Sequence, residues 1–305
     1  MRSANISVVI PTCYRVDKLV TSLQRILACE PPPSELIVHV DAGDAETARC
    51  VRSAFASVQL IESVEPVGPG GGRNRLIAAA SCPFVASFDD DSYPIDSDYF
   101  ACLERTFDRF PEAGVVAVQI FHEDEVVQPR ATAAAWVADF VGCGCAYRRD
   151  AFKATSGYVP LRIAYGMEEV DLSLRLQECG WRVLKTEALR VFHATRRQNQ
   201  ACSPVIRASI ANLALLAFLR YPARYWWIGI GQVLNRIVWL IRKRRWSGIL
   251  DGIAGIPMHL WRYRRFRALV TASTLLSYLA LRRRAIPLAS GIIDIVECSF
   301  DSVPL

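Results

Sequence analysis

Three consecutive aspartates, Asp89, Asp90 and Asp91, directly follow the apolar run 84–88. Neighbouring carboxylates repel one another unless a cation binds between them. Oxygen ligands suit Mg2+ or Mn2+, which typically bind one or two protein carboxylates together with substrate phosphates. Because Asp89 and Asp91 point to the same side of an extended chain, we expect them to share one metal ion while Asp90 faces elsewhere. A solvated acidic turn is the alternative, but the position after an apolar strand favours the metal site.

A second acidic group, Glu168, Glu169 and Asp171, stands in the first turn of a predicted helix. Apolar residues recur at four-residue spacing along 170–176, which is typical of a helix with one buried side. One of these carboxylates could point into a cleft and act as a general base. The alternative is that the acidic residues complement the helix dipole, with Asp171 and Arg175 as an ion pair.

His193 ends the apolar run 188–192, which has the composition of a strand. A histidine in that position is more often a hydrogen-bonded core or edge residue than a ligand. Close to a carboxylate metal site, however, its imidazole becomes a candidate ligand. We therefore group His193 with Asp89 and Asp91 as candidate ligands of one divalent ion.

The glycine-rich segment 68–72 precedes Arg73, Asn74 and a predicted helix over 73–80. A glycine-rich turn before a helix exposes backbone N–H groups, and a helix N-terminus favours anions. The guanidinium of Arg73 adds a fixed charge that suits phosphate. The segment does not have the pattern of a P-loop, and an ordinary flexible turn explains it equally well.

The elements that must position these side chains alternate between strand and helix. Apolar, β-branched runs lie at 6–10, 36–40, 58–61 and 84–88, and helical periodicity spans 19–27 and 46–56. This alternation predicts an α/β fold with a mostly parallel sheet flanked by helices, in which ligands bind at the carboxyl ends of the strands. Asp41 and the triple aspartate both follow strands at such ends.

Taken together, these segments resemble the family 2 glycosyltransferases, which have the Rossmann-like GT-A fold. The resemblance runs from about residue 6 to residue 193. It rests on the order of VVIPT, Asp41, GGGRN, DDD, GCGCAYRRDAF, GMEEVDLSLRL and His193. It implies an inverting, metal-dependent enzyme of hexosyl- or deoxyhexosyltransferase type. Such an enzyme moves a sugar from a nucleotide-diphosphate donor to a hydroxyl of a glycan or lipid-linked acceptor, as in polysaccharide biosynthesis.

The resemblance also implies roles for single residues. Asp41 matches the residue that holds the nucleotide base, Asp89 the aspartate near the ribose, and Asp91 the metal ligand of the DXD motif. Glu169 matches the catalytic base, and His193 a histidine that completes the metal site in some members. The expected catalytic residues are Glu169, Glu168 and Asp171, the metal ligands are Asp91, Asp89 and His193, and the substrate-binding residues are Pro11, Thr12, Asp41, Gly72, Arg73, Asn74, Asp89, Asp90, Trp136, Gly142 and Gly144.

Two departures from the family pattern bear on these roles. Asp41 is followed by Ala-Gly-Asp rather than the commoner Asp-Gly-Ser. The base position holds Glu169 where the family usually has aspartate, which moves the carboxylate by ~1.5 Å, one C–C bond length. Such a shift matters for near-attack geometry, so Glu168 and Asp171 remain competitors for the role of base.

The stretch 136–152 is expected to line the acceptor side of the site. Gly142 and Gly144 would let the backbone approach a ligand closely. Trp136 could stack on a sugar face, although a core position explains this aromatic residue equally well. Cys143 and Cys145 are expected to be buried thiols rather than a metal-binding pair.

Composition and charge indicate the class of protein and its division into two parts. In 305 residues, 52% are hydrophobic and 22% charged, which suits a chain that buries a sizeable core. The ten cysteines form no CxxC pair and favour free thiols in a reducing cytosol. Residues 203–305 carry 15 Lys and Arg against 4 Asp and Glu, and five of the seven tryptophans. We therefore predict a GT-A domain over 1–202 and a basic, amphipathic helical tail over 203–305.

The predicted tail has arginine clusters at 242–245, 262–267 and 282–284 between apolar stretches. Its uncharged runs, 208–219, 225–235 and 268–281, are each shorter than the ~18–20 residues of a spanning helix. Basic amphipathic helices with interfacial aromatics fit adsorption to anionic lipid. We expect a cytoplasmic enzyme, peripheral on the inner face of the plasma membrane. The alternatives are a dimer interface, which would make a homo-oligomer, and hairpins inserted part-way into one leaflet; apolar residues between the clusters argue against nucleic acid.

Two other functions are alternatives to a glycosyltransferase. A sugar-nucleotide nucleotidyltransferase would need a phosphate-activating lysine near the glycine-rich segment, and none lies between Lys18 and Lys153. A non-catalytic, membrane-attached protein that binds sugar nucleotides would carry the same motifs without turnover.

Overall fold

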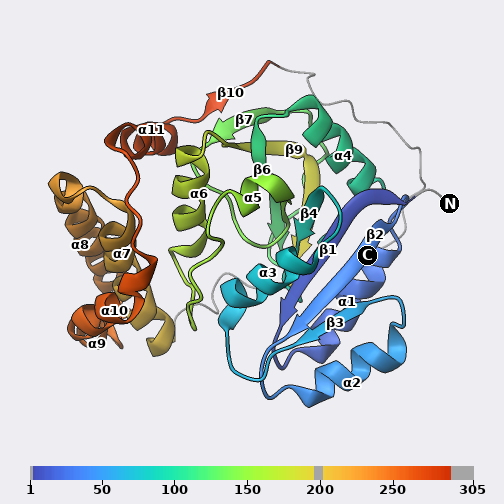
Figure 1. Ribbon diagram of the computed structural model, residues 1–305, viewed down its shortest axis with the longest axis horizontal. Helices are drawn as coiled ribbons and strands as arrows, with labels where there is room; N and C mark the ends of the chain where they lie inside the picture. The colour runs from blue at the N-terminus through green and yellow to red at the C-terminus, as the bar shows by residue number, and fades with distance from the viewer. Residues whose placement is uncertain (1–2, 196–201, 290–305) are drawn as a thin grey trace.

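The computed structural model describes residues 3–195 and 202–289, and within them the strands form one mixed sheet (Figure 1). The sheet order is β10-β7-β9-β6-β8-β4-β1-β2-β3, with β5 paired to β9. The strands are β1 Ala4–Thr12, β2 Pro33–Val40, β3 Gln59–Glu62, β4 Phe84–Ser87, β5 Ser92–Pro94, β6 Ala113–His122, β7 Ala134–Val137, β8 Cys145–Arg148, β9 Arg182–His193 and β10 Ile286–Pro287.

The first half of the sheet is the parallel part that the sequence predicts. Strands β4, β1, β2 and β3 are joined in parallel pairs, and they alternate with helices α1 Val16–Leu27, α2 Ala45–Ala54 and α3 Gly68–Ala79. In α1, Leu19, Leu23 and Ile26 are buried because residues three or four apart share one helix face. The strands end at one edge, where Asp41 and the triple aspartate follow them.

The second half of the sheet is mixed rather than parallel. β8 pairs antiparallel with both β4 and β6, β7 and β5 are antiparallel to β9, and only β6 and β9 run parallel. Helices α4 Tyr99–Arg109, α5 Arg149–Lys153 and α6 Glu168–Glu178 accompany this half. The expectation of a mostly parallel sheet is therefore confirmed for β1–β4, whereas in the second half only the pair of β6 and β9 fits it.

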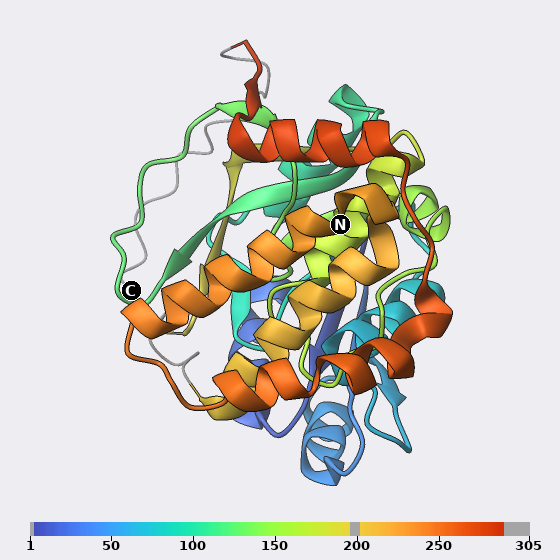
Figure 2. The same cartoon turned by 90° about the vertical axis from the view of Figure 1, so that its left-hand side faces the viewer.

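The helices after residue 202 form a layer on one side of the sheet domain, which Figure 2 shows face on. We call it the C-terminal layer. It comprises α7 Ser203–Arg220, α8 Trp226–Arg242, α9 Ile249–Ala254, α10 Ile256–Tyr263 and α11 Ala272–Arg283, with short 3-10 turns at Ala223–Tyr225 and Arg264–Phe266.

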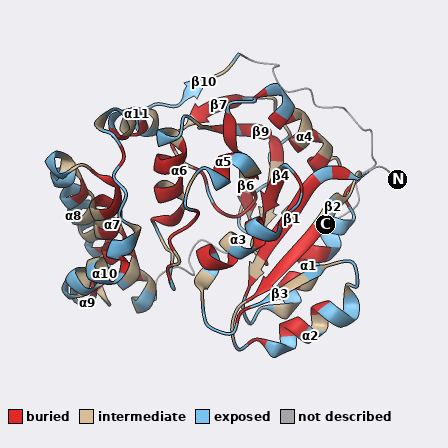
Figure 3. Ribbon diagram, viewed as in Figure 1, coloured by how far each residue is buried: buried red, intermediate tan, exposed pale blue. Residues whose placement is uncertain are grey.

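The C-terminal layer shares a hydrophobic core with the sheet domain. Leu215, Leu219 and Tyr278 from the layer pack in one cluster with Met167 and Leu174 of the α6 region. β10 also pairs with β7, so the chain returns to the sheet after α11. In Figure 3 the strands, α6 and the inner side of α7 are mostly buried, whereas α8, α9 and α10 turn exposed residues outward. The segment expected as a separate tail is thus packed onto the sheet domain over its described residues.

One described helix has the length and composition of a membrane span. It is α7, and 56% of its 18 residues are buried inside the protein. A core helix meets the same criteria of length and composition, and α7 holds the fully buried, charged Arg220. The nine described cysteines are all unpaired, as expected, and Cys298 lies outside the described residues.

Candidate active site

A cavity of about 370 Å3 opens where β1, β2 and β4 end. Because parallel strands end at one edge of a sheet, residues far apart in the sequence meet there. Pro11 and Thr12 from the end of β1, Asp41 after β2, and Asp89 and Asp90 after β4 all line the cavity. Five of the predicted substrate-binding residues therefore surround one space.

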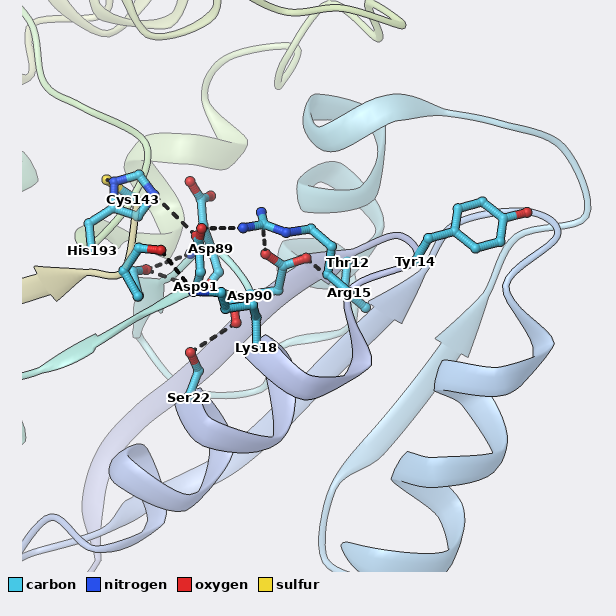
Figure 4. Close-up of polar contacts among 12 residues, drawn as sticks. Thr12, Tyr14, Arg15, Lys18, Ser22, Asp89, Asp90, Asp91, Cys143 and His193 are labelled. Atoms are coloured by element: carbon cyan, nitrogen blue, oxygen red, sulfur yellow. Dashed lines mark hydrogen bonds and ion pairs between the residues drawn. The ribbon is translucent and has the colours of Figure 1, made fainter. Parts of the chain in front are cut away.

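Each of the three aspartates has polar partners, and Figure 4 shows those of Asp90 and Asp91. Asp89 is ion-paired with Arg73 of α3, whose Nε also donates to Ser87 Oγ at 3.1 Å. Asp90 accepts from Thr12 Oγ1 at 2.9 Å. The third residue, Asp91, has only 2% of its surface exposed. Its Oδ1 lies 3.1 Å from His193 Nε2.

Arg15 is a residue of this site that the sequence did not single out. Its guanidinium bridges two aspartates, with Nη1 2.7 Å from Asp90 Oδ1 and Nη2 ion-paired with Asp91. Arg15 stands immediately before α1, in a segment without periodicity, so only the tertiary fold brings it to the triple aspartate. The expectation that Asp90 faces away from Asp91 is wrong, because Arg15 binds both.

Burial and these partners together set the protonation of the site. Burial raises the pKa of Asp90 to about 7, even though Arg15 and Thr12 favour its ionised form. Burial also opposes ionisation of Asp91, but the bonds from His193 and Arg15 outweigh it and lower its pKa. For His193, burial disfavours the charged imidazole, yet the bond to Asp91 and the charge of Asp89 outweigh it and raise its pKa.

Two of the three residues expected to hold a metal ion, Asp89 and His193, converge with Cys143. Ligand atoms of Asp89, Cys143 and His193 lie within 4.8 Å of one another, and Asp91 contacts the other ring nitrogen of His193. Carboxylate oxygens and an imidazole fit Mn2+ or Mg2+. Cys143 was expected to be only a buried thiol. Its Sγ lies 3.4 Å from His193 Nδ1, so Cys143 is a further candidate ligand beside Asp89 and His193, and burial raises its thiol pKa well above the ordinary value.

Asp41 binds the start of helix α3. Its Oδ1 accepts from Val67 N and its Oδ2 from Gly68 N, both at 3.0 Å. The helix begins at Gly68 rather than at Arg73, because the glycines form its first turn. The first backbone N–H groups expected to receive a phosphate therefore already donate to the carboxylate of Asp41, which offers its remaining surface to the cavity.

Two predicted substrate-binding residues in α3 serve packing instead. Asn74 accepts from Tyr158 N at 2.8 Å and donates to Tyr158 O at 2.9 Å, so its amide holds the chain that leads to α6. A Cβ on Gly72 would lie 2.7 Å from His39 Nδ1. Gly72 thus permits α3 to lie close to β2.

The two glutamates at the start of α6 lie beside the aspartates. Glu169 Oε1 accepts from Gly142 N at 3.2 Å. Burial raises the pKa of Glu169 above its ordinary value, against the charge of Arg73. Arg73 is itself ion-paired with Asp89, so Glu169 and the triple aspartate lie near the same guanidinium. Glu168 is more deeply buried, and burial together with the neighbouring Glu169 raises its pKa well above the ordinary range.

Asp171, a competitor for the catalytic base, has a structural role. Its Oδ2 accepts from Arg175 Nη2 at 2.5 Å and its Oδ1 from Arg220 Nε at 2.5 Å. Asp171 and Arg220 each have 1% of their surface exposed. The ion pair between Asp171 and Arg175, which was the alternative interpretation of the sequence, is present. The Asp171 carboxylate is buried and does not line the cavity.

Trp136 is a core residue and not an acceptor platform. Its ring packs edge-on against Phe110, with centroids 5.8 Å apart, and lies under the Arg182 guanidinium at 4.0 Å. Gly142 and Gly144, which were predicted to let a ligand approach the backbone, both lie close to protein atoms. Gly142 lies against Glu169, and Gly144 has a φ of +84°, which favours glycine, while a Cβ there would meet Val191 at 2.8 Å.

The amino-acid sequence matches a known protein family. Residues 4–204 match the sequence model of the family described as Glycosyltransferase like family 2. No protein with a curated description matches the sequence significantly.

Similar solved structures include three glycosyltransferase-type chains. GalNAc-T7 with UDP, GalNAc and Mn2+ has a TM-score of 0.56 at 15% identity, over 73% of this chain and 49% of that one. Mannosyltransferase PcManGT from Pyrobaculum calidifontis, with GDP-Man and Mn2+, has a TM-score of 0.53 at 16% sequence identity, and the match covers 92% of this chain and 80% of that one. S. aureus TarS 1-349 with UDP-GlcNAc has a TM-score of 0.51 at 14% sequence identity, and the match covers 85% of this chain and 91% of that one. This chain spans about half the length of GalNAc-T7. These likenesses show the fold, which is the expected GT-A fold.

Proposed function

The chain belongs to the family described as glycosyltransferase like family 2, and from this membership we propose that it transfers a sugar from a nucleotide-diphosphate donor to a hydroxyl group. The observation that carries the proposal is that His193 lies beside both Asp89 and Asp91 at the edge of the cavity, and that Glu169 lies near Arg73, which is ion-paired with Asp89. Similar structures with UDP, GDP-Man or UDP-GlcNAc support a nucleotide-sugar as the donor class.

In this proposal Asp91, Asp89 and His193 hold a divalent ion, Mn2+ or Mg2+. Such an ion neutralises diphosphate charge and acts as a Lewis acid. The structures of GalNAc-T7 and PcManGT with Mn2+ support this choice of cofactor. Arg15 is ion-paired with Asp91 and lines the cavity. Its guanidinium suits the phosphates of a donor in the same place.

Glu169 is the proposed base. A hydroxyl is a weak nucleophile, so a carboxylate takes its proton as the oxygen attacks the anomeric carbon. Its hydrogen bond from Gly142 orients the carboxylate. Direct attack with a single base inverts the configuration at that carbon, which makes the enzyme an inverting transferase.

The acceptor is proposed to lie at an anionic membrane surface on the cytoplasmic side of the plasma membrane. Support comes from α8, where Trp227, Ile230, Leu234, Val238 and Ile241 are all exposed and recur every three or four residues. We call these residues the α8 stripe. Trp227 has 67% of its surface exposed. The basic cluster 242–245 directly follows the stripe, an arrangement that suits anionic lipid.

A thermal-shift screen with Mn2+ tests the donor proposal. UDP- and GDP-sugars are added with and without the ion, because a ligand that binds the folded state raises its melting temperature. We expect one donor class to raise it only in the presence of Mn2+. Asp91→Asn should lose that shift, whereas Asp108→Asn, an exposed aspartate of α4, should keep it.

The same proteins then enter an assay for release of the nucleoside diphosphate. Release that depends on Mn2+ and is lost in Asp91→Asn supports a transferase. A donor-dependent shift without any release, even with added glycan or lipid-linked acceptors, indicates the non-catalytic binding protein instead. If no nucleotide-sugar changes the melting temperature, the proposed function is wrong.

A further inference from the structure

A second cavity, of about 430 Å3, lies between the C-terminal layer and the chain just before α6. Its wall includes Leu161, Arg162 and Ile163 from that chain, and residues of α7, α9 and α10. None of these residues belongs to the candidate active site except Arg162. The cavity is therefore built jointly by the sheet domain and the C-terminal layer.

The cavity is strongly basic. Arg162, Arg207 and Arg262 line it, and Asp251 is the only carboxylate residue in its wall. Among the described residues, none of the three guanidiniums has a hydrogen bond or ion pair. Positive side chains without acidic partners around one space favour a bound anion. The planar guanidinium suits phosphate in particular, because it can donate two parallel hydrogen bonds.

The floor of the cavity is a fixed, neutral hydrogen-bond network. His259 Nε2 lies 2.9 Å from Asn212 Oδ1, and the Asn212 amide donates to the carbonyls of Ile163 and Tyr165 at 2.9 and 3.1 Å. Burial, together with the nearby Arg262 and Arg207, lowers the pKa of His259 to about 4. The charge of the cavity therefore comes from its three arginines, all of which are exposed.

Two neighbouring surfaces indicate what the anion belongs to. Arg162 also lines the cavity at the triple aspartate, so a ligand in the second cavity lies next to the donor site. On α10, Met258 and Trp261 are 67% and 61% exposed. They stand directly beside His259 and Arg262 in the sequence, so one side of α10 faces the basic cavity and the adjoining side presents apolar surface.

We propose that this basic cavity binds the phosphate of a lipid-linked acceptor, whose hydrocarbon chain lies along the exposed apolar residues of α10. This inference rests on the proposed function and specifies its acceptor: an amphiphile with a phosphate head. The phosphate contacts Arg207 and Arg262, and Arg162 is the residue shared with the donor cavity. A soluble glycan without phosphate would leave the arginines unpaired.

Binding of farnesyl phosphate to the full-length protein in detergent micelles tests the proposal. Farnesol and inorganic phosphate serve as separate arms, and calorimetry measures each affinity. We expect farnesyl phosphate to bind the wild-type protein and both other compounds to bind at least about tenfold more weakly. The double variant Arg207→Ala/Arg262→Ala should lose about tenfold or more of the farnesyl phosphate affinity, since it loses charge-assisted hydrogen bonds.

The matched control is Arg109→Ala/Arg224→Ala, which removes two exposed arginines that lie outside the cavity and outside the basic clusters of the C-terminal layer. Its farnesyl phosphate affinity should change by less than about twofold. An equal loss in both double variants would mean diffuse charge rather than a site and would overturn the proposal. If farnesol binds as tightly as farnesyl phosphate, the cavity does not recognise the phosphate. If inorganic phosphate binds as tightly, the cavity does not recognise the hydrocarbon chain. Either result would overturn the proposal.

Melting temperature and donor binding keep the readouts separate. The replaced arginines have no polar partners among the described residues, so both double variants should melt close to the wild type and keep the Mn2+-dependent donor shift. Donor binding without farnesyl phosphate binding contradicts only this inference. Farnesyl phosphate binding that depends on Arg207 and Arg262, without any donor binding, upholds the cavity and contradicts the proposed transferase.

Discussion

Glu169 combines the position and the environment that a general base requires. Its carboxylate is oriented by the amide of Gly142 and lies near Arg73, which in turn binds Asp89. Glu168, the neighbouring candidate, points toward α3, where a Cβ on Gly70 would lie 2.0 Å from its Oε1. Of the acidic residues in the first turn of α6, Glu169 is therefore the one placed beside the aspartates.

Replacing Glu169 with glutamine tests this assignment. Glu169→Gln keeps the size and hydrogen-bonding shape of the side chain but cannot accept the proton. We expect transfer to fall by about 10²–10⁴-fold, with the Mn2+-dependent donor shift nearly unchanged. Glu169→Asp is the control, because it restores a carboxylate and should recover measurable transfer. Wild-type rates in the glutamine variant would remove Glu169 from the mechanism.

The pH dependence of transfer should reflect the raised pKa of Glu169. The base works only when deprotonated, so kcat/KM rises with pH through its pKa. Since burial raises that pKa, the acid limb should lie above the ordinary carboxyl value of 4.5. A pH profile of kcat/KM, with folding checked at each pH, measures it. A limb at or below the ordinary value would argue that a solvent-exposed carboxylate is the base.

At the scale of elements, α6 and the C-terminal layer are joined by a buried charge network. Asp171 of α6 binds Arg175 one turn later and Arg220 of α7. Arg220 also donates to the carbonyls of Phe266 and Ala268 at 2.8 and 3.1 Å. The same carboxylate therefore fixes the position of α7 relative to the helix that carries Glu169.

Removing this carboxylate should destabilise the protein. Asp171→Ala leaves two buried guanidiniums without their anionic partner, which costs about 3–5 kcal/mol. Denaturant unfolding measures the loss. Asp124→Ala, at an exposed position, is the control and should stay within about 0.5 kcal/mol of the wild type. A small effect of Asp171→Ala would mean that the pair is not desolvated in solution.

The loop that carries Gly142 has little room beside the base. A Cβ at position 142 would lie 2.8 Å from Glu169 Oε1, so Gly142→Ala should displace that carboxylate. We expect transfer to drop by about tenfold to a hundredfold while the protein stays folded, as measured by kcat and circular dichroism. In Gly231→Ala the new methyl has nothing within 4 Å, and transfer should persist.

At the scale of the whole molecule, the C-terminal layer has one buried and one exposed side. Its inner side shares a core with α6, so deleting residues 203–305 would expose apolar surface of the sheet domain and obscure any effect on membrane binding. Substitutions on the exposed side are the sharper test, because they leave that core intact.

Charges in the α8 stripe should weaken membrane binding. Trp227→Glu/Ile230→Glu places carboxylates where lipid contact is proposed, and we expect the protein to stay in the supernatant when anionic vesicles are sedimented. Val64→Glu/Val126→Glu changes two exposed valines of the sheet domain and should leave co-sedimentation unchanged. Unaltered binding of the stripe variant would indicate that another surface, or a second copy of the chain, meets this layer.

The sequence by itself determined what depends on neighbours along the chain. Periodicity located β1–β4, α1 and α2, and the strand ends located Asp41, the triple aspartate and His193. The ordered motifs also pointed to the family. These features follow from local spacing, because a side chain's place on a strand or helix repeats every 2 or 3.6 residues.

Only the tertiary structure decided which side chains meet across the fold. It brought Arg15 to Asp90 and Asp91, directed Asp171 to Arg220 and placed Trp136 in the core. It also gathered Arg162, Arg207 and Arg262 around one cavity. Such partners are set by the packing of elements that are distant in sequence, and no local pattern encodes that packing.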